Sequence, residues 1–423
     1  MKSVDELLQE MGSTGLGKGQ GKLVIVFSLL VLSGSAAFLH GISGPEAARA
    51  WQAYLVNFVF WTGLAFGAVL LSAILTMTGA RWGRPIKRLA EAPGAFLPVS
   101  FLLFWGLYFG KEQIFPWLHE SIGHKAAWLN TFFLFARDGT GLLILTALSV
   151  AILYTSLRGD QRIRKVRVTR IEDIAEAVEK DRHAQSVLSP VFALLYALVL
   201  SLIGFDLVMS LDPHWISTLF GAYFFIGSFY TGLAAVAVLA GISVLWAKTD
   251  GFVGPRQFHD LGKLLLGFCI VTGDFFYAQF LVIWYGNLPE ETRYVILRTR
   301  QEPWDTIAWV VLVVCFVVPF LVLLVRRVKM KPAAMTFLGG LILCGMWLER
   351  FLLIAPSLHH EKPTPPGLME IVISGGFLGL MCLCLLLFFR KVSILPVSDP
   401  LLYESMEAGG MASTSLHDSR DTV

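Results

Sequence analysis

Ten long apolar runs constrain the fold of this chain more than any other feature of its sequence. A helix that crosses a bilayer needs about 20 mostly apolar residues, and backbone groups in hydrocarbon must bond within the protein. The sequence therefore predicts an all-α fold, a polytopic membrane protein with about ten transmembrane helices. The expected spans are Leu23–Phe38, Tyr54–Thr76, Phe96–Phe109, Phe132–Leu157, Pro190–Leu211, Thr218–Trp246, Leu261–Trp284, Ile307–Val325, Met335–Ile354 and Ile371–Phe389.

Composition excludes several classes of protein. Charged residues make up 15% of the chain, against roughly 25% in ordinary soluble domains, and the net charge of +3 gives no basis for nucleic-acid binding. All five cysteines lie in apolar runs and none forms a C-x-x-C pair. We therefore expect no metal site, no iron–sulfur cluster and no covalently bound haem in this chain.

Loop charge predicts the orientation in the membrane. Lys and Arg gather after the second, fourth, sixth, eighth and tenth apolar runs, while the other loops contain few. By the positive-inside rule, both termini are expected in the cytoplasm. The stretch IRKVRVTRIEDIAEAVEKDRHAQ between the fourth and fifth runs predicts an amphipathic helix facing the cytoplasm, and the preferred interpretation is a solvated connector over the lipid head groups. The polar tail after Lys391 is expected to extend over the surface.

Short internal matches predict a parallel repeat. FWTGLA at Phe60–Ala65 returns as FYTGLA at Phe229–Ala234, four helices later and hence in the same orientation. Asp206 and Glu349 each stand seven residues before a proline. Two glycine pairs, at 63/67 and 375/379, predict close helix contacts. The expected parts are a cytoplasmic segment 1–22, a flanking helix 23–40, four-helix bundles 51–214 and 215–360, a flanking helix 371–391 and a cytoplasmic tail 392–423.

Ionisable residues inside apolar runs are costly and mark candidate functional positions. Five of them are expected near the outer face of the membrane, whereas Asp274 is expected near mid-height in the seventh run. The five are Arg137, Asp138, Asp206, Glu349 and Arg350.

Two interpretations of these charges stay open at this level. Arg137 and Asp138 point about 100° apart on a helix and should pair across helices, either as a structural lock or in proton handling. Asp206 and Glu349 have few obvious partners, so they favour proton exchange or a contact with quinol. Asp274 is a candidate proton relay, or else a hydrogen-bonding partner of Tyr277 or of a neighbouring helix.

One stretch carries a family resemblance. SLDPHWISTLFGAYFFIGSFYTGLAAVAVLAG (Ser210–Gly241), together with RDGTG at Arg137–Gly141, closely resembles the NrfD/polysulfide-reductase membrane subunits, and among them the ActF subunits of bacterial alternative complex III. The resemblance extends over most of the chain in helix count and topology.

The resemblance implies a place in the bacterial inner membrane within a quinol:cytochrome c oxidoreductase. The implied partners are a paralogous NrfD-like subunit, an iron–sulfur subunit, cytochrome c subunits and small single-span subunits. Haem and iron–sulfur centres would belong to those partners. This chain would contribute quinol interaction, with menaquinone or ubiquinone, or proton conduction.

Three alternatives compete with that function. The chain could anchor a polysulfide- or dimethylsulfoxide-reductase-type complex, in which quinol oxidation serves another acceptor. It could be a structural scaffold without its own quinone site. It could also be a secondary transporter, since such proteins contain repeats and membrane-embedded charges.

Overall fold

The computed structural model describes residues 20–120, 122–165, 171–247, 249, 251–358 and 364–405. Ten helical segments in these ranges are long and apolar enough to cross a membrane, and no strand occurs in them. The predicted fold class is therefore confirmed. Most of the predicted cytoplasmic segment 1–22 lies outside the described residues.

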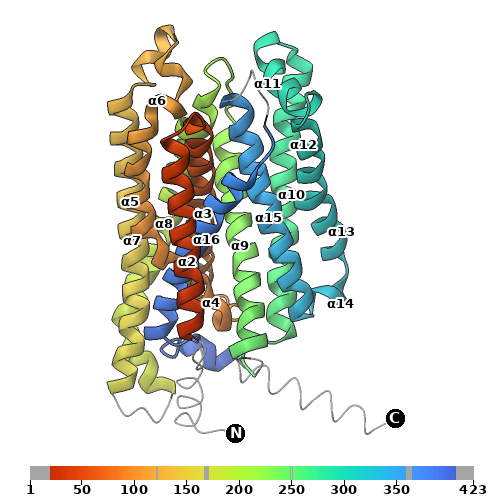
Figure 1. Cartoon of the computed structure of the whole chain (residues 1–423). Coiled ribbons are helices and arrows are strands. Elements are labelled where there is room, and N and C mark those ends of the chain that lie inside the picture. Colours follow the sequence, from red (N-terminus) through yellow and green to blue (C-terminus); the bar gives the residue numbers. More distant parts are fainter. Residues whose placement is uncertain are drawn as a thin grey trace.

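Fifteen α-helices and several shorter helical turns make up the described spans. The α-helices are α2 (Gln20–Ile42), α3 (Ala47–Met77), α4 (Arg84–Glu91), α5 (Leu97–Gly106), α6 (Lys111–Ile114), α7 (Thr131–Lys165), α8 (Ile171–Ile203), α9 (Phe220–Ala247), α10 (Pro255–Gly286), α11 (Pro289–Arg300), α12 (Trp304–Leu312), α13 (Val318–Leu324), α14 (Arg326–Lys329), α15 (Pro332–Leu358) and α16 (Leu368–Lys391). One π-helical turn, Gly204–Val208, extends α8, and another, Val313–Val317, joins α12 to α13. In Figure 1, α6 and α11 lie at the upper end of the bundle and α4 and α14 at the lower end.

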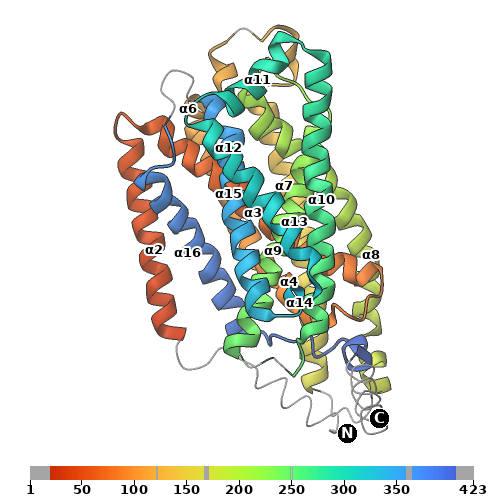
Figure 2. The same ribbon diagram turned by 90° about the vertical axis from the view of Figure 1, so that its right-hand side faces the viewer.

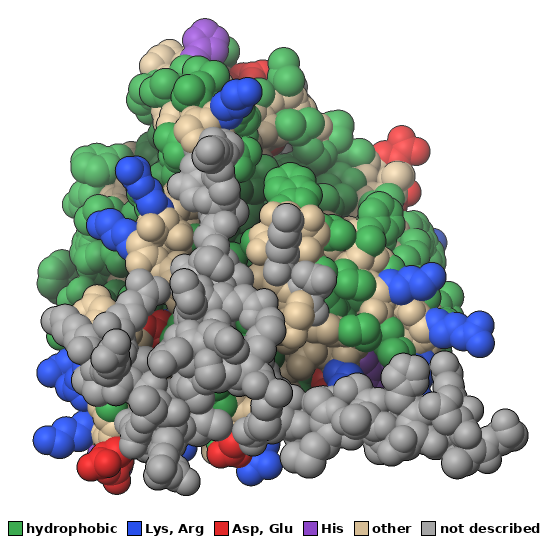
Figure 3. Space-filling model, turned by 90° about the horizontal axis from the view of Figure 1, so that it is seen from below, with side chains coloured by type: hydrophobic (Ala, Val, Ile, Leu, Met, Phe, Trp, Pro, Cys, Tyr) green, Lys and Arg blue, Asp and Glu red, His purple; other side chains and the backbone are tan. Residues whose placement is uncertain are grey.

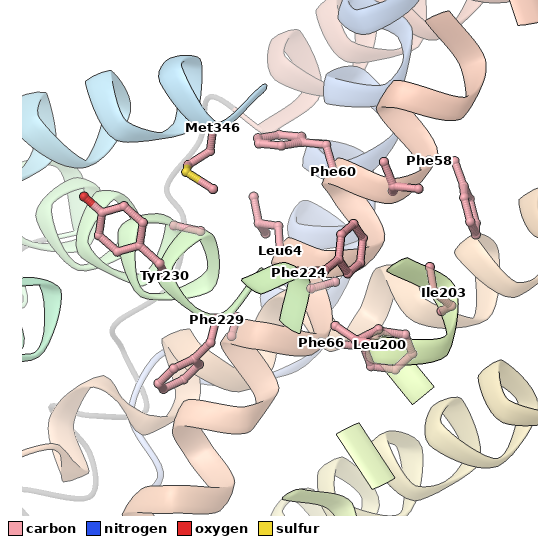
Figure 4. Close-up of a cluster of buried hydrophobic side chains, with 14 of the residues drawn as sticks. Phe58, Phe60, Leu64, Phe66, Leu200, Ile203, Phe224, Phe229, Tyr230 and Met346 are labelled. Carbon is pink, nitrogen blue, oxygen red and sulfur yellow. The ribbon is translucent and has the colours of Figure 1, made fainter. Parts of the chain in front are cut away.

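Helix α3 is the centre of the molecule. It is apolar on all sides, and 89% of its most hydrophobic window is buried by other helices, whereas the corresponding share for α2 is 6%. A helix that is hydrophobic all round belongs in the interior. Its aromatic side chains pack with apolar side chains of α8 and α9 and with Met346 of α15 (Figure 4). The core therefore lies where these four helices meet.

Helices α3 and α9 approach each other through the two matching sequence motifs. A Cβ on Gly67 would overlap the Ser228 carbonyl oxygen, and one on Gly232 would overlap the backbone of Gly67 and Ala68. A Cβ on Gly63 would come within 2.7 Å of the Ser228 hydroxyl. These glycines let two backbones meet where larger residues would hold them apart.

Helices α2 and α16 form a pair at one edge of the molecule (Figure 2). The close approach is between Gly34 and Gly376, and Gly379 also lies against the α2 backbone. Gly375, the position expected from the sequence, has only an ordinary contact with Leu30 at 3.8 Å. The contact thus uses the neighbouring position, one residue further around the helix.

Two groups of helices lie on either side of the α3–α9 contact. One group consists of α3, α5, α7 and α8, which pack against one another. The other consists of α9, α10, α12–α13 and α15, which do the same. The division into a parallel repeat stays a prediction.

Two expectations about the lower end are wrong. The connector before the fifth span is no separate surface helix, because α8 runs unbroken from Ile171 and buries Val178, Asp181 and Gln185. The tail after Lys391 is not spread over the surface as far as residue 405. Its residues 393–400 are buried, with Leu395 fully covered, because apolar side chains there fill the base of the bundle.

Candidate functional site: two buried charge clusters joined along α7

Asp206 is the centre of a charged cluster at the upper end. It lies in the π-helical turn at the end of α8, a local distortion that is frequent at functional sites. Arg137 of α7 donates from Nε at 2.8 Å and also contacts the same carboxylate from Nη2 at 2.6 Å, and Trp128 donates from Nε1 at 2.9 Å. The guanidinium lies between the rings of Trp128 and Phe133. Asp206 is therefore paired, contrary to the expectation of an unpartnered carboxylate, and Arg137 does pair across helices.

Asp138 is buried beside this pair without a bond of its own. It is 1% exposed, and neither carboxylate oxygen has a hydrogen-bond partner among the described residues. Its side chain faces that of Asp206. A single cation, Arg137, thus stands beside two carboxyl groups, and like charges in one dry site favour a proton on one of them.

Glu349 and Arg350 form a second cluster at the same end. Tyr223 donates its hydroxyl to Glu349 at 2.5 Å, and Arg350 lies 3.4 Å from the other Glu349 oxygen. Arg350 also donates to the Phe224 carbonyl and rests on the Phe224 ring. Both side chains are buried and come from adjacent positions at the same end of the bundle as Asp206.

Asp274 belongs to neither cluster. It is exposed on the outward face of α10, and it has no hydrogen bond or ion pair within the part of the chain that the structure describes. The alternative of a hydrogen bond to Tyr277 or to a neighbouring helix is wrong among the described residues, because α10 turns this position away from its neighbours. The role of a proton relay at mid-height stays a prediction.

A third cluster, at the lower end, was not predicted from the sequence. Arg88 is fully buried and contacts Glu91 at 2.6 Å and Asp160 at 2.5 Å. Ser156 bridges from α7, accepting a bond from Arg88 and donating to Glu91. The basic stretch containing Arg88 was assigned to a loop because positive charge near a membrane end usually faces water. A signal was nevertheless present: Arg88 and Glu91 lie three residues apart, within reach on a helix.

The tail completes this lower cluster. Asp399 accepts a bond from Arg84 at 2.8 Å and lies 3.9 Å from Lys87. Burial would raise the pKa of Asp399, but Lys87 and Arg84 outweigh burial and hold its pKa below the ordinary value. Asp160 accepts from the Ser398 backbone N–H at 2.9 Å. The tail is thus fastened to both α4 and α7 by charged groups.

A cavity of about 420 Å³ lies against the lower cluster. Its lining residues are mostly polar or charged and include Lys87, Ser156, Asp181, His183 and Asp399. A space of this size has room for several water molecules. Lys87 and Ser156, which line it, both contact Glu91.

One face of α7 connects the upper and lower clusters. Polar residues that are at most 8% exposed recur along it: Asp138, Thr146, Ser149, Ser156 and Asp160. At 3.6 residues per turn they share an arc of about 80°, and at 1.5 Å per residue they extend over about 33 Å, the thickness of a bilayer's hydrocarbon core. We call these five residues the polar face of α7. The Thr146 hydroxyl has no protein partner among the described residues.

Comparison with known proteins supports a single family. The family described as "Polysulphide reductase, NrfD" matches residues 44–360, which includes all three clusters except Asp399. The chain belongs to the NrfD family. No curated protein matches the sequence. Family membership indicates a multi-pass membrane subunit of a polysulfide-reductase-like oxidoreductase complex, of the kind whose members typically partner with iron–sulfur subunits.

Proposed function

We propose that this NrfD subunit conducts protons for a quinol-oxidising complex of the alternative complex III type, in the position of an ActF subunit. The observation that carries the proposal is the polar face of α7, which joins two buried charge clusters across the membrane. Leaving a buried polar group unpaired is costly, and Asp138 and Thr146 have no hydrogen-bond partner among the described residues, so these two positions favour a function. Ser149 bonds to the Leu145 carbonyl, and Ser156 and Asp160 belong to the lower cluster.

The upper cluster suits a group that exchanges protons with a quinol. Quinol oxidation releases electrons and protons, and a nearby carboxylate can accept a proton. Asp206 and Asp138 supply two carboxyl groups, while Arg137 stabilises the one that is ionised. Trp128 and Phe133 are 44% and 41% exposed and would flank an aromatic headgroup. In this proposal, the electrons leave through centres in partner subunits.

The lower cluster suits proton exchange with water. The cavity reaches Lys87 and Ser156, and Ser156 bonds directly to Glu91. Along α7 the steps from Asp138 to Thr146 and from Ser149 to Ser156 are about 12 and 10 Å at 1.5 Å per residue. Steps of that length exceed a hydrogen bond, so proton transfer along the face requires intervening water molecules.

Orientation follows from the charge at the lower end. Lys and Arg side chains surround that end (Figure 3), including Arg81, Arg158 and Arg326. By the positive-inside rule it faces the cytoplasm, both termini included, in a bacterial inner membrane. The upper clusters then lie on the opposite side, where quinol would be oxidised.

The test uses Asp138→Asn and Asp206→Asn in the assembled complex. We expect each variant to lower quinol:cytochrome c turnover or the number of protons moved per electron, with assembly intact. Glu290→Gln removes an exposed carboxylate at the same end and should change neither. Full activity and normal coupling in both Asp variants would refute the site assignment.

A second candidate function is the membrane anchor of a polysulfide- or dimethylsulfoxide-reductase-type complex, and the family description favours it. Co-purification separates the two. Cytochromes c that purify with the chain and accept electrons from quinol support the first, whereas a partner that reduces polysulfide or a sulfoxide supports the second. Asp variants that lose assembly rather than turnover would instead indicate a scaffold.

A further inference from the structure

Asp274 lies at mid-depth on a face of α10 that is exposed among the residues that the structure describes. Helix α10 is Pro255–Gly286, and Asp274 stands 11 residues after Lys263, the last charged residue before the apolar part of the helix, and 12 residues before Gly286. At 1.5 Å per residue it is therefore about 16–18 Å from either end of that apolar part. Only 17% of the most hydrophobic window of α10 is buried.

The residues around Asp274 on α10 form an exposed, mostly apolar surface. Residues three, four and seven positions away share its face. Of these, Val271 is 36%, Ile270 44% and Tyr277 58% exposed. A Cβ on Gly267 would meet nothing within 4 Å. We call Gly267, Ile270, Val271, Asp274 and Tyr277 the Asp274 face. Its open glycine lets a neighbouring backbone approach closely.

Lipid is an unfavourable cover for this face. An aspartate at the bilayer centre costs about 2.5–3.5 kcal/mol on insertion scales, and Asp274 is too short to reach a head group from mid-depth. The cost falls when a cation or hydrogen-bond donor from a protein lies beside the carboxylate. The face therefore requires a protein partner with a complementary group at the same depth.

A second copy of this chain fits poorly. Two α10 helices meeting on this face in the same membrane orientation would place one Asp274 against the other. The buried cations Arg88, Arg137 and Arg350 already contact carboxylates of their own clusters. Lys263, on α10 itself, lies three turns away and pairs with Asp260.

We propose that the Asp274 face binds a transmembrane helix of a different polypeptide, one that presents a Lys, Arg or His side chain at mid-membrane. This inference rests on the proposed role as a subunit of a larger complex. It does not depend on which acceptor receives electrons or on the path of the protons.

The test places a photo-crosslinking amino acid at Val271 or Tyr277 in the chain expressed with its native partners. We expect one protein adduct, and the crosslinked peptide should be an apolar span with a basic residue within about one turn of the crosslink. Adducts with lipid only, with a second copy of this chain, or with a span lacking a basic residue would overturn the proposal.

Charge variants test the complementarity. Asp274→Lys should lower the crosslink yield from position 277 by about tenfold or more, and reversing the partner's basic residue to Asp should restore it. Leu194→Lys places the same charge on an exposed, apolar part of α8 and should leave the yield unchanged. An unchanged yield with Asp274→Lys would also overturn the proposal. Turnover is measured separately, so failure here is distinguishable from failure of the proposed function.

Discussion

The arrangement of two carboxyl groups around Arg137 makes a quantitative prediction about stability. Asp206 is fully buried and contacts Arg137 at 2.6 Å. Removing one partner of a buried ion pair ordinarily costs about 3–5 kcal/mol, because the other charge is left uncompensated. Here Asp138 lies beside the pair and can release its proton to supply a replacement charge. We therefore expect Asp206→Asn to cost only about 2 kcal/mol.

The two single variants and the double variant form a cycle. Asp138→Asn should cost less than about 1 kcal/mol if Asp138 is the carboxyl group that carries the proton, because a neutral group there contributes no charge to Arg137. With both carboxylates removed, no counter-charge remains, and the double variant should lose the full 3–5 kcal/mol or so. The coupling energy would be about 1–2 kcal/mol, well above the error for independent sites.

Thermal unfolding of the purified complex, followed by tryptophan fluorescence, measures these values. At roughly 2 °C per kcal/mol for a chain of this size, Asp206→Asn should lower the Tm by about 4 °C and the double variant by about 8 °C. Glu290→Gln provides the baseline for an exposed carboxylate. A double variant no less stable than the sum of the singles would refute a proton shared between the two groups.

Three further perturbations test the packing and the charges elsewhere. Gly67→Leu should destabilise by about 3 kcal/mol or more through overpacking against α9, whereas Gly340→Leu, with open space at its Cβ, should change the Tm little. Arg298→Met should cost about 1–3 kcal/mol, because Arg298 donates to the Leu352 carbonyl freed by Pro356, while the exposed Arg300→Met should be neutral. Asp399→Asn should lower the Tm at pH 7 by the equivalent of about 3 kcal/mol. Since the folded pKa of Asp399 is depressed, that contribution is complete above the ordinary value of about 3.9. It is lost as pH falls through the folded pKa, so titration of the Tm difference should show it shrinking only below about pH 4.

The apolar runs were sufficient to predict the ten spans, because hydrocarbon leaves the backbone few alternatives. The charged positions of the upper clusters were also predictable, since Arg137, Asp206 and Glu349 interrupt apolar runs. Pairing of Arg137 across helices was predictable too, but the identity of its partner was not. The contact between Arg137 and Asp206 depends on how α7 and α8 pack and on a π-helical turn, neither of which a single sequence encodes in a local pattern.

The lower cluster was missed for a different physical reason. Arg84, Lys87 and Arg88 look like ordinary loop charges near a membrane end, and the tail looks polar. The structure instead folds the tail inward, so that Asp399 and Asp160 neutralise the buried cations. Long-range charge compensation between positions more than 300 residues apart, as for Arg84 and Asp399, is invisible to any window along the chain.

Asp274 differs in the opposite way from the lower cluster, because it is exposed where its apolar surroundings in the sequence suggest burial. An aspartate in an apolar run predicts an interior position, yet α10 presents it outward. Which face of a helix is covered depends on every neighbour, including those contributed by other polypeptides.

The central claim, that the polar face of α7 conducts protons, is tested most directly by Thr146→Val. This change removes a hydroxyl that has no partner among the described residues and keeps the shape of the side chain, so it should leave stability and assembly intact. Thr140→Val makes the same change on the exposed side of α7 and is the matched control. The measurement is the number of protons moved per electron after a quinol pulse to the complex in liposomes. A ratio that falls in Thr146→Val but not in Thr140→Val is the predicted result, and an unchanged ratio at normal turnover in both would contradict the claim.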